Sequence, residues 1–141
     1  MKYPKLFEPG KIGNLTVKNR IVMAPLAMGA AEKDQTIGPA FLAYLLERAR
    51  GGVGMIVLEN TRVDDQHGVA AECQASVARD EHIAPLAAAA EALHKEGVVF
   101  FTQLHHPGRE TFSNLNGSEP VWRSEERRVG KECRSRWSPY H

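Results

Sequence analysis

Between residues 20 and 104, short apolar runs alternate with stretches of helical periodicity. The apolar runs are RIVMAP (residues 20–25), VGMIVLE (residues 53–59) and VVFFTQL (residues 98–104). Each run is apolar almost throughout, which is typical of strands that are covered on both faces of a parallel sheet. Strands that alternate with helices predict right-handed β–α–β units and therefore an α/β fold.

Two segments between these runs carry helical signals. Thr36 and Pro39 precede FLAYLLERAR (residues 41–50), whose apolar side chains recur on one face, and a Gly-Gly pair follows it. This pattern predicts an amphipathic helix with a defined end. The second segment has Pro85 near its start and Gly97 after its last turn. Proline in a first turn and glycine just past the end are both typical of a helix.

Two connections carry further information. Ahead of the alternation, KIGNLTVKNR (residues 11–20) has Gly13-Asn14 between two short β-type runs, which predicts a small hairpin. Such a hairpin could plug the bottom of a barrel. The polar connection from Thr61 to Glu81 is too long for a minimal loop, and we expect it to shape the mouth of a site.

Composition bounds the class of protein. The chain has 141 residues, 43% of them hydrophobic and 25% charged, and its formal net charge is +1. These values predict one ordinary globular domain with no general reason to bind nucleic acid. Cys73 and Cys133 lie far apart without metal-ligand spacing, and Cys73 is interpreted as a small filler in its loop. With no secretion signal and no apolar run of membrane length, the expected location is the cytoplasm, with no membrane partner.

Candidate site residues follow each predicted strand. Ligands of parallel α/β sheets bind at the carboxyl ends of the strands, so the places to examine are APLAM (residues 24–28), Glu59-Asn60 and QLHHPGR (residues 103–109). The residue types in QLHHPGR fit a metal site, an anion site or the rim of a cofactor pocket. Adjacent histidines point in different directions and no carboxylate or cysteine lies at ligand spacing beside them, so no metal is predicted.

Three motifs together carry a family resemblance. LFEPGKIGNLTVKNRIVMAPLAMG, ERARGGVGMIVLEN and ALHKEGVVFFTQLHHPGR occur in this order over about residues 5–121. In this order and spacing they resemble the N-terminal third of the old yellow enzyme family of FMN-dependent NAD(P)H oxidoreductases. The similarity is greatest to the branch with 2,4-dienoyl-CoA reductase-like and bile-acid-inducible enoate reductases. The resemblance implies a TIM (β/α)8 barrel, of which this chain supplies the first three βα units after the N-terminal hairpin.

The resemblance also implies cofactor-binding positions. A side-chain amide offers both a donor and an acceptor to the polar edge of a flavin. The positions that correspond to flavin contacts in the family are Ala24, Pro25, Leu26, Ala27, Asn60 and Gln103. No catalytic residue is assigned within the chain. His106 and Arg109 are interpreted as residues of a substrate loop or as structural residues of the Pro-Gly turn.

The sequence departs from the family pattern at three positions. Ala27 stands where the family commonly has a threonine or cysteine that hydrogen-bonds the flavin, and alanine offers no such bond. Gly29 stands where one subgroup has a substrate-contacting tyrosine. Asn60 stands where a smaller alanine or glycine is frequent, so its amide either crowds the ring or adds a hydrogen bond to it.

The implied reaction belongs to a longer parent protein. The parent is expected to take hydride from NAD(P)H onto FMN and to reduce the activated C=C bond of an α,β-unsaturated carbonyl compound, whether an enone, an enoate or an enoyl thioester. A TIM barrel takes about 250 residues, so residues 1–122 are interpreted as the N-terminal part of an incomplete barrel and as inactive alone. Carbonyl-polarising donors, and an iron–sulfur cluster if the parent carries one, are expected in the missing part. Nothing in the sequence indicates NADH against NADPH or the oligomeric state.

The last nineteen residues differ from the rest. RSEERRVGKECRSRWSPYH (residues 123–141) holds six Lys or Arg and three Asp or Glu, and the apolar periodicity stops there. One hypothesis is a short non-catalytic protein that binds nucleic acid or another anionic partner through this basic tail; another is a solvated terminus. We favour a third, because the stretch resembles the translation of a common short-read sequencing adapter. Residues 123–141 are then a disordered artefact and not a domain.

Overall fold

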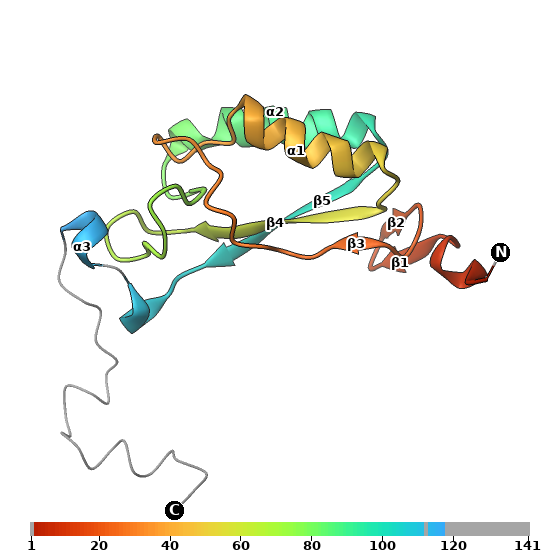
Figure 1. Ribbon diagram of the computed structural model, residues 1–141, viewed down its shortest axis with the longest axis horizontal. Helices are drawn as coiled ribbons and strands as arrows, with labels where there is room; N and C mark the ends of the chain where they lie inside the picture. Colours follow the sequence, from red (N-terminus) through yellow and green to blue (C-terminus); the bar gives the residue numbers. More distant parts are fainter. Residues whose placement is uncertain (1, 112, 118–141) are drawn as a thin grey trace, which may run out of the picture.

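The computed structural model describes residues 2–111 and 113–117, so the predictions made for residues 123–141 lie outside the described residues. Two helices, α1 and α2, lie over one face of a parallel sheet of strand order β3-β4-β5 (Figure 1). A separate two-stranded sheet, β1-β2, lies near the N-terminus. The chain order β3, α1, β4, α2, β5 is that of successive β–α–β units, which confirms the predicted α/β class.

The strands occupy the three apolar runs, with shifted boundaries. They are β3 (Val22–Met23), β4 (Met55–Arg62) and β5 (Val99–His105). The run ending at Pro25 gives only a two-residue strand, since the chain leaves the ladder before the proline. The expectation that Glu59 and Asn60 follow a strand ending at residue 59 was wrong. Strand β4 extends three residues further, because β5 and residues 75–77 both pair with its end.

The helices begin and end close to their predicted signals. Helix α1 spans Pro39–Arg50, with Pro39 at its first position. Helix α2 spans Ile83–Lys95 and follows a 3-10 turn over Asp80–His82, so it begins two residues ahead of Pro85. Gly97 has a φ of 68°, the left-handed conformation that glycine adopts without strain. Shorter helical turns are Pro4–Leu6, Gly108–Glu110 and α3 (Ser113–Asn116).

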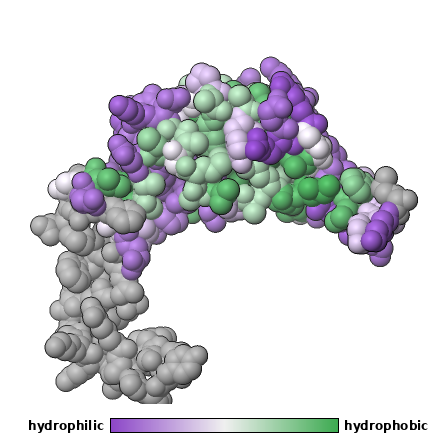
Figure 2. Space-filling model, viewed as in Figure 1, coloured by the Kyte–Doolittle hydropathy of each residue, from purple (hydrophilic) through white to green (hydrophobic). Residues whose placement is uncertain are grey.

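The core lies between the helices and the sheet. Its buried members are Phe41, Leu45, Ala49, Ile56, Leu58, Leu93 and Val98. On the opposite face of the sheet, Val22 is 46% exposed and Phe101 is 38% exposed. Among the described residues, the strands are therefore covered by helices on one face only, and the other face of the sheet leaves apolar side chains exposed. Figure 2 shows hydrophobic residues gathered across the middle of the molecule, with hydrophilic residues toward its top and ends.

The predicted hairpin forms and closes the N-terminal end of the sheet. Strands β1 (Gly10–Ile12) and β2 (Leu15–Val17) pair antiparallel, and Gly13 in the turn has a φ of 57°. Directly after β2, Lys18 Nζ donates to the Glu96 carbonyl (2.9 Å) and Asn19 Nδ2 to that of Gly52 (2.7 Å). The Glu96 carbonyl lies just after α2 and the Gly52 carbonyl just after α1, each ahead of the strand that follows. The hairpin is therefore tied to the N-terminal end of the sheet, opposite the candidate site. Within the described residues, no helix is long and apolar enough to cross a membrane.

Candidate functional site

A β-bulge in β4 aligns the two amide side chains of the candidate site. Leu58 pairs with Thr102, and the next aligned pair is Asn60 with Gln103, so β4 has one extra residue, Glu59, between them. Side chains alternate between the faces of a strand, and an extra residue reverses that alternation. The bulge therefore turns Asn60 to the same face as Gln103, the open face that also carries Phe101, while Glu59 turns to the buried face.

Both amides are available to a ligand. The Gln103 side chain is exposed and that of Asn60 is half-buried. The Asn60 carbonyl accepts a hydrogen bond from Gln74 Nε2 (2.9 Å), but no hydrogen bond within the described residues involves either side-chain amide. Two neighbouring amides with free donors and acceptors on one face can recognise a planar polar edge, because such an edge presents the complementary groups.

The loop after β3 lies at the same end of the sheet. Leu26 is 59% exposed, Ala24 and Ala27 are exposed, and Pro25 is half-buried. The backbone N–H groups of Leu26 and Ala27 have no hydrogen-bond partner among the described residues. The structure thus gathers all six predicted cofactor-binding residues at the carboxyl ends of β3, β4 and β5.

Beneath this loop lies the carboxylate of Glu59, which is only 3% exposed. Its Oε2 accepts hydrogen bonds from the backbone N–H of Met28 (2.6 Å) and of Gly29 (3.3 Å). Burial raises the pKa of the Glu59 carboxyl, and backbone N–H groups of Met28, Gly29 and Ala75 oppose that rise in pKa. The second oxygen, Oε1, is buried with no hydrogen-bond partner of good geometry.

The long connection after β4 is ordered and flanks the site. Residues 73–77 run beside the end of β4, where Arg62 N donates to the Ala75 carbonyl (2.9 Å) and Val77 N to that of Arg62 (3.0 Å). Asp65 forms ion pairs with Arg62 (2.8 Å) and Arg79 (2.8 Å). These contacts hold the connection against the sheet, at the end of the strands where the site lies.

His106 joins two loops at this end. Its Nδ1 accepts a hydrogen bond from Gly108 N (3.0 Å), so the neutral ring carries its proton on Nε2. Nε2 lies 3.7 Å from Asp64 Oδ2, and His67 Nδ1 lies 3.2 Å from the same oxygen. Backbone N–H groups of the long connection, that of His67 first, lower the pKa of Asp64. Arg109 lies in the turn over Gly108–Glu110, and its side chain is outside the described part.

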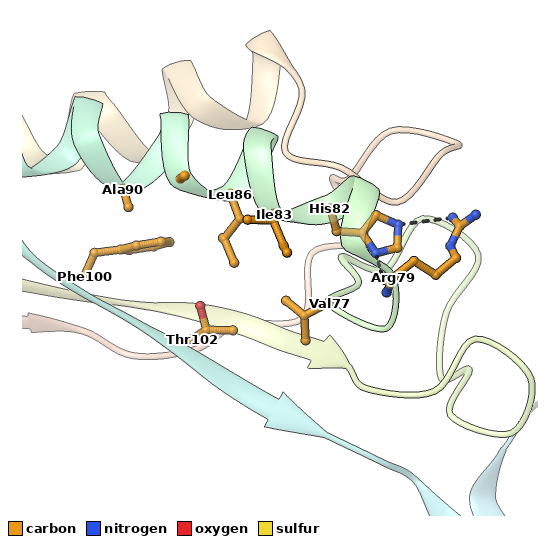
Figure 3. A pocket seen from close by; sticks show the side chains of 9 residues that line it. Val77, Arg79, His82, Ile83, Leu86, Ala90, Phe100 and Thr102 are labelled. Atoms are coloured by element: carbon orange, nitrogen blue, oxygen red, sulfur yellow. Dashed lines mark hydrogen bonds between the residues drawn. The ribbon is translucent and has the colours of Figure 1, made fainter.

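Elsewhere, the described part contains a cavity but no arranged set of metal ligands. No group of three or more His, Cys, Asp or Glu side chains is arranged to hold a metal ion among residues 2–111 and 113–117. A cavity of about 330 Å³ lies between α2 and the helix-covered face of β5. Figure 3 shows Leu86, Ala90 and Phe100 around its apolar part and the Arg79–His82 pair at one end. This cavity lies on the helix-covered side of the sheet, away from Asn60 and Gln103.

Comparison with known proteins decides the family. The family described as NADH:flavin oxidoreductase / NADH oxidase matches residues 5–135. The chain belongs to this family. It is 42% identical over 120 residues to the NADH oxidase of Thermoanaerobacter brockii. The aligned segment covers 84% of this chain and 18% of that protein. It is 38% identical over 107 residues to the NADPH dehydrogenase of Bacillus subtilis, which covers 75% of the chain and 31% of that protein.

Two solved structures are also similar to this chain. The old yellow enzyme homologue of Zymomonas mobilis superposes with a TM-score of 0.72 at 32% identity, over 83% of this chain and 32% of that one. A 2-naphthoyl-CoA reductase superposes with a TM-score of 0.76 at 29% identity, over 82% of this chain and 18% of that one. The chain therefore spans less than a third of the length of these relatives. The resemblance to the old yellow enzyme family, predicted from the three motifs, is confirmed, and the relatives named above are oxidoreductases of this family.

The residues present fit the cofactor of this oxidoreductase family. Two side-chain amides and two backbone N–H groups that form no hydrogen bond with other described residues lie at one end of a parallel sheet, where this class of fold binds ligands. The role of one residue was missed in the sequence. Glu59 was named together with Asn60 as a place to examine, but no task was assigned to its carboxylate. Its signal was a carboxylate inside a core strand, a position that is unfavourable unless the charge is hydrogen-bonded.

Proposed function

We propose that this chain forms the flavin-contacting N-terminal part of an FMN-dependent NAD(P)H oxidoreductase that reduces the activated C=C bond of α,β-unsaturated carbonyl compounds. The observation that carries the proposal is the pairing of Asn60 with Gln103 across β4 and β5, with neither side-chain amide hydrogen-bonded to another described residue. When bound, FMN would supply the hydride chemistry between NAD(P)H and the activated C=C bond.

Each residue of the site has a limited task in this proposal. The Gln103 amide would donate to and accept from the polar edge of the flavin, and Asn60 would add a second amide beside it. Residues 24–27 would supply backbone groups to the cofactor. Ala27 offers only a methyl group, so redox tuning by a side-chain hydrogen bond at that position is absent. His106 holds the turn after β5 through Gly108 N and faces Asp64, which supports the structural interpretation of this histidine.

The substrate class rests on relatives. One structural neighbour is a 2-naphthoyl-CoA reductase solved as a complex with 2-naphthoyl-CoA, and another is morphinone reductase. Together they support a carbonyl-conjugated small molecule, either a free enone or a CoA thioester, as the substrate. The connection over residues 61–81, held by the Asp65 ion pairs, flanks the route by which such a substrate would approach.

We further propose that catalysis requires a longer parent protein. The chain spans 18% to 32% of the relatives compared above, and Val22 and Phe101 remain exposed on a face that a closed barrel buries. Residues 1–122 then belong to the barrel, and the groups that polarise the substrate carbonyl come from the segment beyond them.

The test is expression of the intact gene, recovered by sequencing outward across the codons of Trp122 and Arg123 from the source DNA. We expect a protein that purifies with FMN, is reduced by NADH or NADPH, and is reoxidised by 2-cyclohexen-1-one or an enoyl-CoA. The 141-residue chain serves as the control and should show little or no turnover. A protein from the intact gene that neither retains FMN nor binds added FMN would contradict the proposal.

A further inference from the structure

Residues 26 and 27, in the middle of the loop after β3, are held by few hydrogen bonds among the described residues. Leu26 and Ala27 make no backbone hydrogen bonds within the described residues, and Leu26 is 59% exposed. The downstream end of the loop is tied by Ala31 N, which donates to the Cys73 carbonyl (3.2 Å). A loop that contacts a ligand through its backbone must hold that backbone in a fixed position. It therefore needs a second point of attachment close to the ligand-contacting residues.

Glu59 supplies that anchor from below. Its Oε2 receives two successive backbone N–H groups, those of Met28 and Gly29. Gly29 has a φ of 61°, and a residue in the left-handed region lets neighbouring N–H groups converge on one anion. Both bonds are charge-assisted when the carboxylate is ionised, which makes them stronger than neutral hydrogen bonds.

The location of the carboxylate is specific. Glu59 is the extra residue of the β-bulge that also turns Asn60 toward Gln103, so one irregularity of β4 provides both the amide and the anchor. A buried carboxylate whose Oε1 has no well-aligned hydrogen bond among the described residues is costly for stability alone. The carboxylate instead bonds the backbone N–H groups of Met28 and Gly29, next to the candidate site. A role in holding this backbone in position explains its burial better than a role in stability.

We propose that Glu59 is a positioning residue for the flavin, because its buried carboxylate fixes the Met28 and Gly29 backbone and thereby the placement of residues 24–27 at the cofactor. The inference rests on the proposed function. Glu59 lies on the buried face of β4 and acts through the loop backbone, so it is not a catalytic residue.

The test compares three variants of the protein from the intact gene. Glu59→Gln keeps the shape and one acceptor oxygen but removes the charge, and we expect the dissociation constant for FMN to rise on the order of tenfold. The reduction potential of the bound flavin should shift, because the loop backbone against the ring is displaced. Glu91→Gln makes the same chemical change on the exposed surface of α2 and should leave both quantities unchanged.

Gly29→Ala tests the same contact from the loop side. A Cβ at this position meets only the Cys73 carbonyl, at 4.0 Å, but the positive φ disfavours alanine. The Gly29 N–H should therefore move while the core under β4 stays intact. We expect weaker FMN binding and a shifted potential in the same direction as for Glu59→Gln.

The outcomes separate the two proposals. If the unaltered protein binds FMN and both variants match it in dissociation constant and potential, Glu59 has only a structural role and the inference fails while the proposed function stands. If the unaltered protein does not bind FMN, the proposed function fails and the inference falls with it. A Glu59→Gln variant that does not fold leaves Gly29→Ala to decide, since unchanged FMN binding in that variant alone overturns the anchor.

Discussion

Asn60 and Gln103 lie directly opposite each other in the register of β4 and β5, because β4 carries one more residue than β5 between Leu58 and Asn60. Without that bulge, the alternation of side chains would turn Asn60 toward the helices. A local irregularity of the backbone therefore decides which side chains can meet a ligand at the carboxyl end of the sheet.

The first prediction concerns the Gln103 amide. Gln103→Leu keeps a similar volume but removes a donor and an acceptor. At about 0.5–1.5 kcal/mol for each hydrogen bond, we expect the dissociation constant for FMN to rise roughly 5- to 100-fold. Flavin fluorescence titration of the protein from the intact gene measures the change.

Gln66→Leu is the matched control for this substitution. It makes the same exchange at an exposed position in the connection after β4. FMN affinity should stay within experimental error of the unaltered protein. Equal losses in both variants would show that Gln103 is not a specific contact.

A second prediction concerns the docking of the hairpin under the sheet. An alanine Cβ at Gly54 would lie 2.6 Å from the Asn19 carbonyl oxygen and 2.8 Å from Val17 Cγ1. Gly54→Ala must displace the hairpin, and we expect a loss of about 1–3 kcal/mol in the free energy of unfolding. Gly10→Ala is the control, since the nearest atom to its Cβ is Arg20 Cγ at 3.8 Å. Urea denaturation followed by circular dichroism compares them, and similar stabilities would contradict the described packing.

The third prediction concerns the two faces of the sheet. Ile56 is fully buried under the helices and Phe101 is 38% exposed on the open face. In the 141-residue chain, Ile56→Ala should lower the free energy of unfolding by about 2–5 kcal/mol, and Phe101→Ala by only ~1 kcal/mol. In the protein from the intact gene, Phe101→Ala should cost as much as Ile56→Ala. If Phe101→Ala costs the same in both proteins, the open face is not covered by a longer chain.

The fourth prediction concerns the pH dependence of stability. Burial raises the folded-state pKa of the Glu59 carboxyl, and no ionic partner contributes to the shift. The native state then holds this proton more tightly than the unfolded state does. The contribution of this group to the free energy of unfolding is greatest below the pKa of an ordinary carboxyl. It falls as pH rises to the raised pKa of the folded state, and it does not change further above that pKa. Glu59→Gln should remove that part of the pH profile, whereas Glu91→Gln should retain it; denaturant unfolding at several pH values measures both.

Much of the fold could be predicted from the sequence, because its signals are local. Apolar runs, a proline at the start of α1 and a glycine after α2 act within a few residues, so helix bounds were accurate. The carboxyl ends of β3 and β5 could also be located, which brought Ala24 and Gln103 to the correct end of the sheet. Family motifs then supplied roles that periodicity alone leaves open.

The features that were not predicted depend on pairing between distant segments. The length of β4 depends on β5 and on residues 73–77, which share no local signal with it. The bulge at Glu59 is defined by the pairing of β4 with β5, whose register shifts by one residue between Leu58 and Asn60. The hydrogen bonds from Met28 and Gly29 to Glu59 span some thirty residues. The tie between His106 and Asp64 likewise joins two loops that are far apart in sequence.

The most direct test of the central claim is to purify the protein encoded by the intact gene and to record its visible spectrum before and after anaerobic addition of NADH or NADPH. We predict a yellow protein that releases FMN on denaturation and whose flavin absorbance bleaches with at least one of the two nucleotides. A colourless protein that takes up no FMN would contradict the assignment of this chain to a flavin site.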